Sequence, residues 1–358
     1  MRPLDRSDVT GQGSGTADDP VVSVLVLAYN HGPYLAEALD SILLQETDFA
    51  FEVLIGEDRS SDDTLRIARR YEERDPSRVR VVTDERNVGM QENLRRLVLA
   101  SRGSYLAFCE GDDYWNSRSK LARQVAVLEE HPDTGAVHSD FVHIAQVAGD
   151  WRALPGYWRH HGVVIPVGEV FPDLVQRNFI QTCTLVVRAE LARQYLASEL
   201  PTDAYKVGDW PLCLFISMQA KIGYVDESLA TYRRVEGSAT NQGHHADIAR
   251  ARNHLAMATD FCRLTGASPE LERAAHEAAM RTILDSAVRA ADVDQARSAL
   301  DWIEMNVPSE GSSLRSKLGR AAIRNVVGIR LVRRYAALGR GSELHHYVSR
   351  PPAAGEHR

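Results

Sequence analysis

Short apolar runs alternate with amphipathic stretches through the first third of the chain. The runs are mostly β-branched or large and apolar, which is typical of strands buried on both faces of a sheet. They cover residues 21–28, 51–55, 79–82 and 105–108. Between them, apolar residues recur at helical spacing and predict helices over 34–45, 65–74 and about 91–100. This alternation predicts an α/β fold with a mostly parallel central sheet, flanked by helices and joined by right-handed crossovers.

Polar loops follow all four predicted strands. In parallel sheets, ligands bind outside the carboxyl ends of the strands. We therefore expect these loops to converge on one cleft. Their polar residues, in chain order, are Asn30, the pair Glu57 and Asp58, Asn87, and the cluster Glu110, Asp112 and Asp113.

The acidic cluster after the fourth strand indicates a divalent cation, Mg²⁺ or Mn²⁺. Neighbouring carboxylates repel and raise one another's pKa unless a positive charge lies between them. Hard cations prefer oxygen ligands and share them with substrate phosphates. The chain has no glycine-rich phosphate loop and no Gly-Lys-Ser/Thr sequence, so the phosphates of a bound nucleotide would need such a cation. The alternative interpretation is a solvated acidic loop.

The second half adds another carboxylate, Asp209. A strand-like run covers 182–187, and Asp209 comes just before an apolar helix predicted over 212–218. On this local pattern Asp209 is a helix N-cap, because its side-chain oxygen can accept the free amides of the first turn.

From Asp247 onward the pattern is helical. Helices are predicted over 248–264 and 293–306, and a third begins at a capped Ser268-Pro269-Glu270 and runs to about 291. We expect a small helical appendage over 247–310.

Composition sets the remaining limits. A chain of 358 residues can hold one large domain and an appendage. Residues 1–20 are polar, lack the apolar core of a secretory signal and are expected to be a disordered tail. The four cysteines lie far apart, which indicates neither zinc nor disulfides and favours a reducing, cytoplasmic location. No apolar run reaches the roughly 18 residues of a membrane span.

The segment 311–341 is strongly basic. It carries eight Lys or Arg residues and no acid, so the rest of the chain has a net charge of −7 − 8 = −15. Apolar residues recur opposite many of the cations, as in an amphipathic helix that binds the inner face of an anionic membrane. Packing on the acidic body of the same protein is an equal alternative. Nucleic acid is disfavoured by the acidic remainder, and 342–358 is expected to be a flexible tail.

The order of these motifs resembles the inverting family 2 glycosyltransferases of GT-A fold, in a subgroup with a Cys-Glu-Gly-Asp-Asp-Tyr-Trp motif at 109–115. The resemblance covers about 21–238 and includes the loop 57–64, Asn87-Val88-Gly89, and Lys120-Leu121 with Gln124. It implies one continuous domain over 21–240. A nucleotide-binding half covers about 21–140, and an acceptor-binding half covers about 141–240.

The resemblance also implies residue roles. Asp58 would hold the nucleotide base, with Glu57 where relatives usually have aspartate. Asp113 would bind the metal, and Asp112 would contact the sugar or ribose and share in metal binding. Asp209 would be the base that activates the acceptor hydroxyl. The other residues implied in donor binding are Ala28, Tyr29, Asn30, Asn87, Asn93 and Arg233.

The chain departs from the family pattern at one position. Relatives often place a His two residues after the arginine that corresponds to Arg233, and this chain has Val235 at that position. His244 or His245, on a mobile loop, could substitute; the alternative is a solvated pair. An acceptor could also dock at His160-His161 beside Tyr157 and Trp158, where simple packing is the alternative.

These observations predict a metal-dependent inverting glycosyltransferase. It would use a nucleotide sugar, most simply a UDP-sugar, and a glycan, lipid-linked or small-molecule acceptor. One alternative is a nucleotidyltransferase of similar fold, although such enzymes usually carry a basic glycine-rich loop that is missing from 29–34. The other is a non-catalytic scaffold that retains the fold.

Overall fold

The computed structural model describes residues 19–147, 150–154, 156–201, 204–205, 208–235 and 244–307. The predicted basic helix over 311–341 and the tail over 342–358 lie outside these residues, as does most of the predicted N-terminal tail. No helix within the described ranges is long and apolar enough to span a membrane.

The first four strands form the predicted parallel sheet. β1 (Val22–Ala28) lies between β2 (Phe51–Glu57) and β4 (Tyr105–Glu110), and β3 (Val79–Thr83) forms the edge next to β2. Helices connect them as the alternation predicts: α1 (Leu35–Leu43), α2 (Thr64–Arg74) and α3 (Met90–Ala100). The parallel pairing brings the carboxyl ends of all four strands to one edge.

Beyond β4 the sheet is mixed, because antiparallel pairs join the parallel ones. β8 (Val186–Arg188) pairs antiparallel with both β4 and β6 (Thr134–Val147). β9 (Lys221–Arg234) runs parallel to β6 and antiparallel to β5 (Tyr114–Trp115). A hairpin joins β6 to β7 (Asp150–Leu154). The sequence pattern predicted no element over 134–154, although β6 is, with β9, one of the two longest strands of this half of the sheet.

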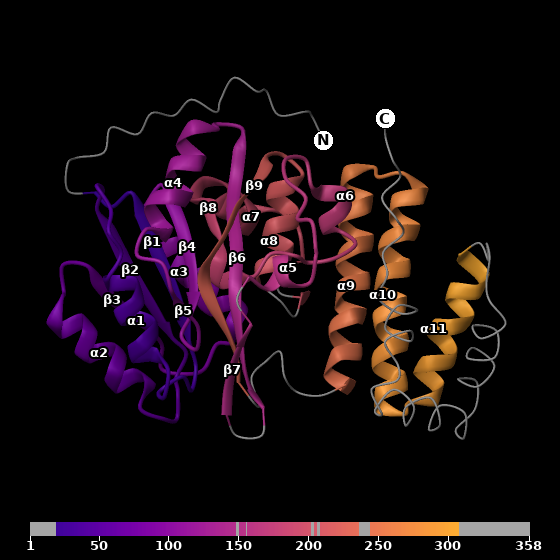
Figure 1. The fold of residues 1–358 in the computed structure, drawn as a ribbon, viewed down its shortest axis with the longest axis horizontal. Helices are drawn as coiled ribbons and strands as arrows, with labels where there is room; N and C mark the ends of the chain where they lie inside the picture. Colours follow the sequence, from indigo (N-terminus) through magenta and orange to yellow (C-terminus); the bar gives the residue numbers. More distant parts are fainter. Residues whose placement is uncertain are drawn as a thin grey trace.

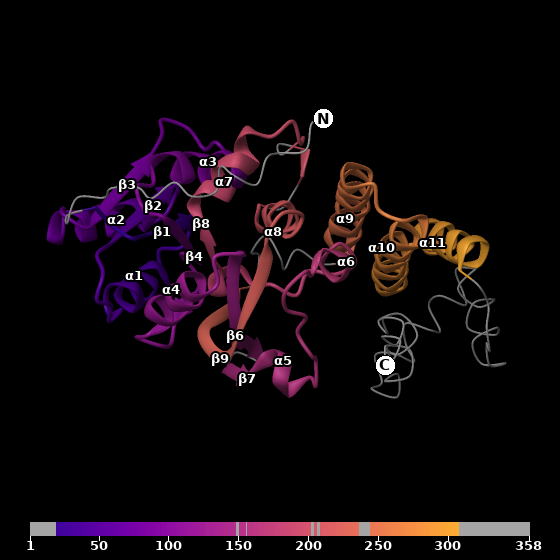
Figure 2. The same cartoon turned by 90° about the horizontal axis from the view of Figure 1, so that it is seen from above.

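Helices cover both faces of the sheet, because β1 buries alternate side chains in two clusters. Leu25 belongs to a cluster with α3, α7 (Ala189–Ala197) and α8 (Asp209–Ser217). Val24 and Val26 belong to a cluster with α1, α2 and α4 (Lys120–Glu130). Figure 2 shows these two layers of helices on opposite sides of the strands.

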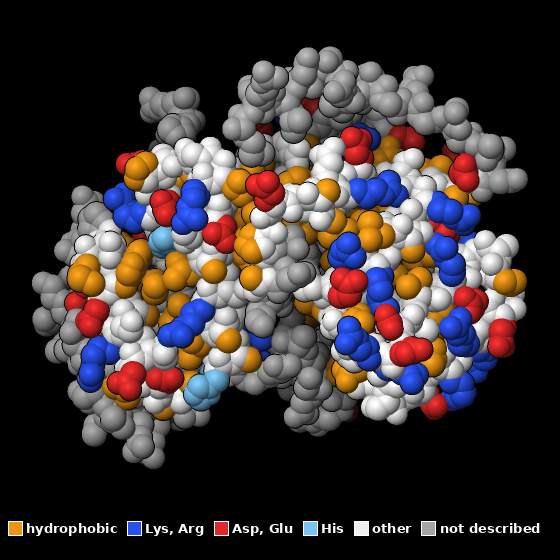
Figure 3. Space-filling model, turned by 180° about the vertical axis from the view of Figure 1, so that it is seen from behind, with side chains coloured by type: hydrophobic (Ala, Val, Ile, Leu, Met, Phe, Trp, Pro, Cys, Tyr) orange, Lys and Arg blue, Asp and Glu red, His pale blue; other side chains and the backbone are white. Residues whose placement is uncertain are grey.

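The C-terminal helices are α9 (His244–Thr265), α10 (Pro269–Ala290) and α11 (Val293–Asn306), close to the predicted ranges. Ser268 caps α10 as predicted, since its Oγ accepts Leu271 N at 3.3 Å. They stack side by side at one end of the molecule (Figure 1). α10 and α11 enclose a small apolar cluster of their own with part of α9. On the face seen in Figure 3, acidic and basic side chains are interspersed.

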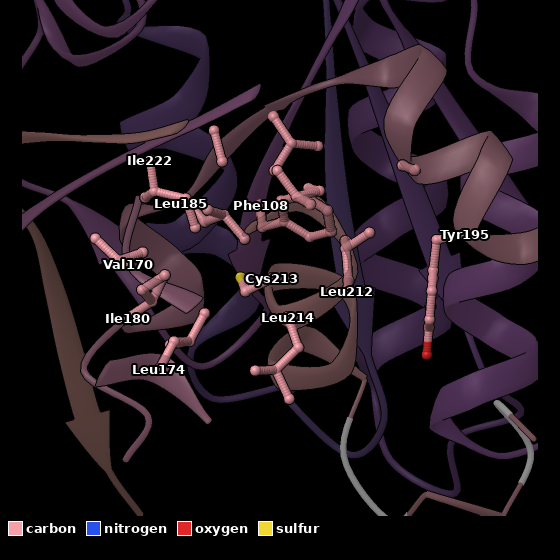
Figure 4. Close-up of a cluster of buried hydrophobic side chains, with 14 of the residues drawn as sticks. Phe108, Val170, Leu174, Ile180, Leu185, Tyr195, Leu212, Cys213, Leu214 and Ile222 are labelled. Carbon is pink, nitrogen blue, oxygen red and sulfur yellow. The ribbon is translucent and has the colours of Figure 1, made fainter. Parts of the chain in front are cut away.

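The main core runs beneath the second half of the sheet. Figure 4 shows Phe108 of β4 and Ile222 of β9 beside Leu212 and Cys213 of α8. Met257 and Phe261 of α9 belong to the same cluster. The first of the C-terminal helices therefore contributes side chains to the main core.

Lys120, at the start of α4, is fully buried. Its Nζ lies 4.3 Å from the centroid of the Trp115 ring and has no hydrogen-bond partner among the described residues. Burial lowers the pKa of Lys120 to about 7. Because the pKa of Lys120 is lower in the folded than in the unfolded chain, the buried ammonium reduces the free energy of unfolding, fully so below the folded pKa. This loss of stability disappears as the pH rises toward the pKa of a lysine in the unfolded chain, about 10.4.

We therefore expect Lys120→Met to raise the free energy of unfolding by about 2–4 kcal/mol near pH 6.5, because an unpaired buried charge is removed. The gain should shrink as pH rises to about 9.5. Urea unfolding of both proteins at the two pH values tests this. A gain that is independent of pH would contradict the charge explanation.

Candidate active site

The acidic turn lies between β4 and β5, at the carboxyl edge of the parallel strands. Gly111 N donates a hydrogen bond to Leu27 O at 2.8 Å, so the turn remains paired to β1. A Cβ at Gly111 would lie 2.8 Å from His31 Nδ1 and 3.3 Å from Ala28 Cβ. The close approach requires glycine and places the turn against the loop that follows β1.

Asp113 is fixed by the end of β9. Its side chain is 1% exposed, and Oδ1 accepts a hydrogen bond from Arg233 N at 2.8 Å. Burial raises the pKa of Asp113 well above its usual range, and the charges of Asp112 and Glu110 raise it further. The carboxylate extends the pairing between β5 and β9 by one side-chain hydrogen bond.

Glu110 is the least satisfied acid of the turn. Its Oε2 is buried and has no hydrogen-bond partner in the part of the chain that the structure describes. Burial raises the pKa of Glu110 to about 8, and the next largest causes are the charges of Asp209 and Asp112. Glu110 therefore has acidic neighbours on both the turn and α8.

Asp209 is the first residue of α8, and the N-cap prediction is wrong. Gly208 occupies the N-cap and no side chain caps the helix. Asp209 Oδ2 instead accepts a hydrogen bond from Thr182 Oγ1 at 2.7 Å. Thr182 belongs to a short 3₁₀ helix, η2 (Thr182–Thr184), where a strand was predicted from residue 182. The structure thus brings the carboxylate of α8 to the acidic turn.

Hydrogen bonds also join the loops after β1 and β2. Asn30 has a φ of 56°, and its Oδ1 accepts Ser61 N at 2.8 Å. Asn30 N donates to Ser60 Oγ at 3.0 Å. Beside it, Tyr29 is 49% exposed, whereas Ala28 is buried. Asn30 and Tyr29 therefore lie on an accessible part of the loop.

Asp58 links the loops after β2 and β3. Its two carboxylate oxygens accept Val88 N at 2.7 Å and Gly89 N at 2.9 Å. Asn87 Nδ2 donates to the backbone oxygen of Asp58 at 2.8 Å. The side chain is 4% exposed, so the loops hold it in one place.

Glu57 and Asn93 are buried behind these loops. Glu57 accepts Ser60 N at 2.6 Å and Thr83 Oγ1 at 3.0 Å. Asn93 Nδ2 donates to Gly56 O at 2.7 Å. In this structure both side chains support the backbone of the β2 loop.

Arg233 lies in a buried cage. Its guanidinium donates to Glu37 Oε2 at 2.6 Å and to the backbone oxygen of Asp112 at 2.9 Å. It also lies over three aromatic rings, those of Tyr34, Tyr114 and Trp151. These contacts tie α1 and the β6–β7 hairpin to the acidic turn.

Three residues of this region have no role in the sequence analysis: His31, Glu37 and Thr182. His31 Nε2 lies 3.8 Å from Asp112 Oδ2. Its position in the turn after the first strand is a signal that could have identified it. Glu37 lies within a predicted helix and Thr182 within a predicted strand. No motif or spacing in the sequence distinguishes either residue from its neighbours.

The other histidines singled out in the sequence lie on helices or directly after one. His244 and His245 begin α9, where a mobile loop was predicted, and His244 Nδ1 lies 3.3 Å from Asp247 Oδ2. His160 ends a short helix, α5 (Tyr157–His160). The ring centroids of His161 and Tyr157 are 4.5 Å apart.

The acidic turn suits a cation that arrives with a ligand. Within the described ranges, no three His, Cys, Asp or Glu side chains form a cation shell by themselves. The orphaned Glu110 oxygen and the raised pKa values of Glu110 and Asp113 are signs of uncompensated negative charge. Mg²⁺ commonly uses one or two carboxylates and completes its shell with water and phosphate oxygens.

Relatives of this chain include glycosyltransferases. The protein Rv1520 of Mycobacterium tuberculosis, which has no assigned activity, is 36% identical over 214 residues, or 60% of this chain and 58% of that protein. TuaG of Bacillus subtilis, named for a glycosyltransferase role in teichuronic acid biosynthesis, is 26% identical over 223 residues. That match covers 62% of this chain and 82% of TuaG. The chain thus matches little more than half of the mycobacterial relative.

Solved structures confirm the predicted fold. The mannosyltransferase PcManGT of Pyrobaculum calidifontis, in complex with GDP-Man and Mn²⁺, matches with a TM-score of 0.53 at 19% identity. The match covers 89% of this chain and 88% of PcManGT. The α/β architecture is therefore GT-A-like, with helices following it.

The family model described as Glycosyl transferase family 2 matches residues 23–181. The match contains the loops after β1 to β4 and ends just before Thr182, so Asp209 lies outside it. Residues 23–181 therefore resemble a glycosyltransferase domain of family 2.

Proposed function

We propose that the whole protein is a metal-dependent inverting glycosyltransferase that takes a sugar from a nucleotide sugar. The observation that carries this proposal is the meeting of the acidic turn with Asp209, which lies on a different element and outside the family match. The charges of Asp209 and Asp112 both act on Glu110. The acidic turn, which would bind the donor, and Asp209, which would act as the base, therefore belong to one cluster of acidic side chains.

The donor would bind along the loops after β1, β2 and β3. Asp58 has one backbone amide on each oxygen and lone pairs to spare. It can accept the imide N–H of uracil, which favours a UDP-sugar. Asn30, Tyr29 and Asn87 lie beside it, and Arg233 could approach the diphosphate from its cage. Ala28, Glu57 and Asn93 would support the loops that hold the nucleotide.

Asp113 and Asp112 would hold the metal. PcManGT carries Mn²⁺ with its nucleotide sugar, which supports the same class of cation here. When bound, a divalent cation neutralises the diphosphate and makes it a better leaving group. The residues around the turn keep its carboxylates in place through Arg233 and the backbone of β9.

Asp209 would be the general base. Thr182 engages its Oδ2, which leaves Oδ1 to take the proton from the acceptor hydroxyl as that oxygen attacks the anomeric carbon. One displacement of this kind inverts the anomeric configuration and needs no nucleophile from the protein. The acceptor would bind in the second half, and the name of TuaG supports a glycan, with a lipid-linked or small-molecule acceptor as the alternatives. Contact with the inner membrane face rests on 311–341 and stays a prediction.

Calorimetric titration with UDP and with GDP, each with and without Mn²⁺, tests this function. We expect nucleotide binding that requires Mn²⁺ and disappears in Asp113→Asn. A panel of nucleotide sugars, scored for hydrolysis, then identifies the sugar. Absence of nucleotide binding would favour a scaffold, and turnover of a nucleoside triphosphate would favour a nucleotidyltransferase.

Thr182→Val should lower kcat for the sugar nucleotide that supports turnover by about 10–150-fold, since a hydrogen bond to a charged group contributes about 1.5–3 kcal/mol. The KM for the donor should stay unchanged because Thr182 engages the base rather than the nucleotide. Thr182→Ser keeps the hydroxyl and should restore the rate. A Val variant with the wild-type kcat would contradict the role of this hydrogen bond.

A further inference from the structure

The segment that leads into Asp209 is held by a helix from the far end of the chain. Tyr205 precedes Asp209 and Trp210 follows it, and both contact α9. In Figures 1 and 2, α9 runs close to α6 (Phe171–Leu174) and α8, and beside α10. No part of α9 lies within residues 23–181, so this support comes from outside the segment that the family model matches.

Trp210 and His254 form the first contact. Their ring centroids are 4.2 Å apart at an interplanar angle of 37°. Trp210 Nε1 donates to Leu174 O at 3.0 Å, and His254 Nε2 lies 2.8 Å from Val175 O, where it can only donate. The two rings therefore bind adjacent carbonyls at the end of α6 and are held against each other in a tilted arrangement.

Burial keeps His254 in the neutral form that this arrangement needs. The side chain is 6% exposed, and burial lowers its pKa to about 4. A neutral imidazole can donate from Nε2 to the carbonyl and still pack against an indole without a charge to solvate. The contact thus persists across the physiological pH range.

Tyr205 and Asp260 form the second contact. Tyr205 is 2% exposed, and its hydroxyl donates to Asp260 Oδ2 at 3.1 Å. Gln91 of α3 donates to the backbone oxygen of Tyr205 at 2.7 Å. The start of the segment is therefore fixed between α3 and α9.

Core packing makes these contacts rigid. Met257 and Phe261 lie between His254 and the end of α9, and both belong to the cluster that contains Leu212 and Cys213 of α8. α9 and the first turns of α8 thus share one close-packed interior, in which a shift of either helix is costly.

We propose that α9 is a positioning element for the base, in which His254 and Asp260 hold the two sides of the segment that carries Asp209. This inference rests on the proposed function, because it assigns α9 to the same site. α9 itself contacts neither the acidic turn nor the donor loops through these residues. Its effect is to set where the Asp209 carboxylate stands, and misplacement by about 1 Å can cost a rate factor of roughly 10².

The test uses four substitutions in the full chain. Tyr205→Phe and Asp260→Ala each remove the same hydrogen bond, Asp260→Asn keeps an acceptor for the hydroxyl, and His254→Ala removes the ring contact. Thr259→Val is the matched control, because Thr259 lies on α9 but faces His276 of α10, with Oγ1 2.9 Å from Nε2. Each protein is assayed for sugar-nucleotide hydrolysis, for UDP binding with Mn²⁺, and for hydrogen exchange in peptides covering 204–214.

We expect His254→Ala to lower kcat by about 10–100-fold, and Tyr205→Phe and Asp260→Ala by about five- to twentyfold each, with UDP affinity unchanged. The double variant Tyr205→Phe/Asp260→Ala should be no slower than the worse single one, since both lose one bond. Asp260→Asn and Thr259→Val should behave like wild type. Exchange over 204–214 should accelerate only in the slow variants.

The outcomes separate the two proposals. If the wild-type protein binds no nucleotide and hydrolyses no sugar nucleotide, the proposed function fails. If it is active, two results overturn the inference alone: wild-type kcat in His254→Ala, or equal losses of kcat and UDP affinity in the slow variants. Equal slowing by Thr259→Val would also overturn it, because general loosening of α9 would then explain the effect.

Discussion

Asp209→Asn is expected to lower sugar transfer by about 10²–10⁴-fold while UDP binding in the presence of Mn²⁺ remains at the wild-type level. General base catalysis contributes a factor of this size. Asparagine has nearly the same shape and can still accept the hydrogen bond from Thr182 Oγ1. The substitution therefore removes the proton acceptor and little else. Measurement of kcat together with calorimetric affinity distinguishes a loss of chemistry from a loss of binding.

A surface aspartate provides the control for this experiment. Asp133 pairs with Lys221 at the other end of the sheet, at 2.6 Å between side-chain atoms. Asp133→Asn should leave both kcat and affinity unchanged. If Asp209→Asn also turned over at the wild-type rate, Asp209 would be excluded as the base, and its contact with Thr182 would be structural.

Asp113→Ala and Asp113→Asn should both reduce transfer by about 10³-fold or more, because the charge that would hold the cation against the diphosphate is lost. The two variants differ in stability. Asparagine retains an oxygen that can accept Arg233 N, whereas alanine leaves that buried amide without its side-chain partner. We expect the Asn variant to melt close to wild type and the Ala variant to melt several degrees lower.

The comparison of the two variants separates two roles of one carboxylate. If Asp113 serves only to hold β9, the Asn variant should keep its activity and its Mn²⁺-dependent UDP binding. Loss of both in a protein that melts normally would assign the negative charge itself to function. Circular dichroism melts and calorimetry with UDP and Mn²⁺ supply both measurements.

The parallel half of the sheet could be predicted because its strands are almost wholly apolar. β6 could not. Its centre contains His138, Ser139 and Asp140, which are all fully buried. Asp140 is satisfied by backbone amides from outside the strand, including Trp158 N at 3.0 Å. Buried polar residues, one of them satisfied from α5, break the apolar pattern on which strand prediction depends.

The candidate site shows the same division. The acids at the ends of the parallel strands could be predicted to lie together, because the topology of a parallel sheet requires it. The contact between Thr182 and Asp209 could not, since it depends on where a 3₁₀ turn and a helix start meet in space. The periodicity of 248–264 also predicted a helix. It shows that one face of the helix is apolar, but not which hydrophobic cluster that face packs against.

The bond between Asp113 and Arg233 joins residues 120 positions apart. A growing chain completes the donor loops long before β9 leaves the ribosome, and until then the Asp113 carboxylate has no strand to hold it. Contacts of such long sequence separation form late in folding. Partly synthesised or truncated chains would therefore contain the family motifs while remaining inactive. Activity would appear only once β9 has been added to the sheet.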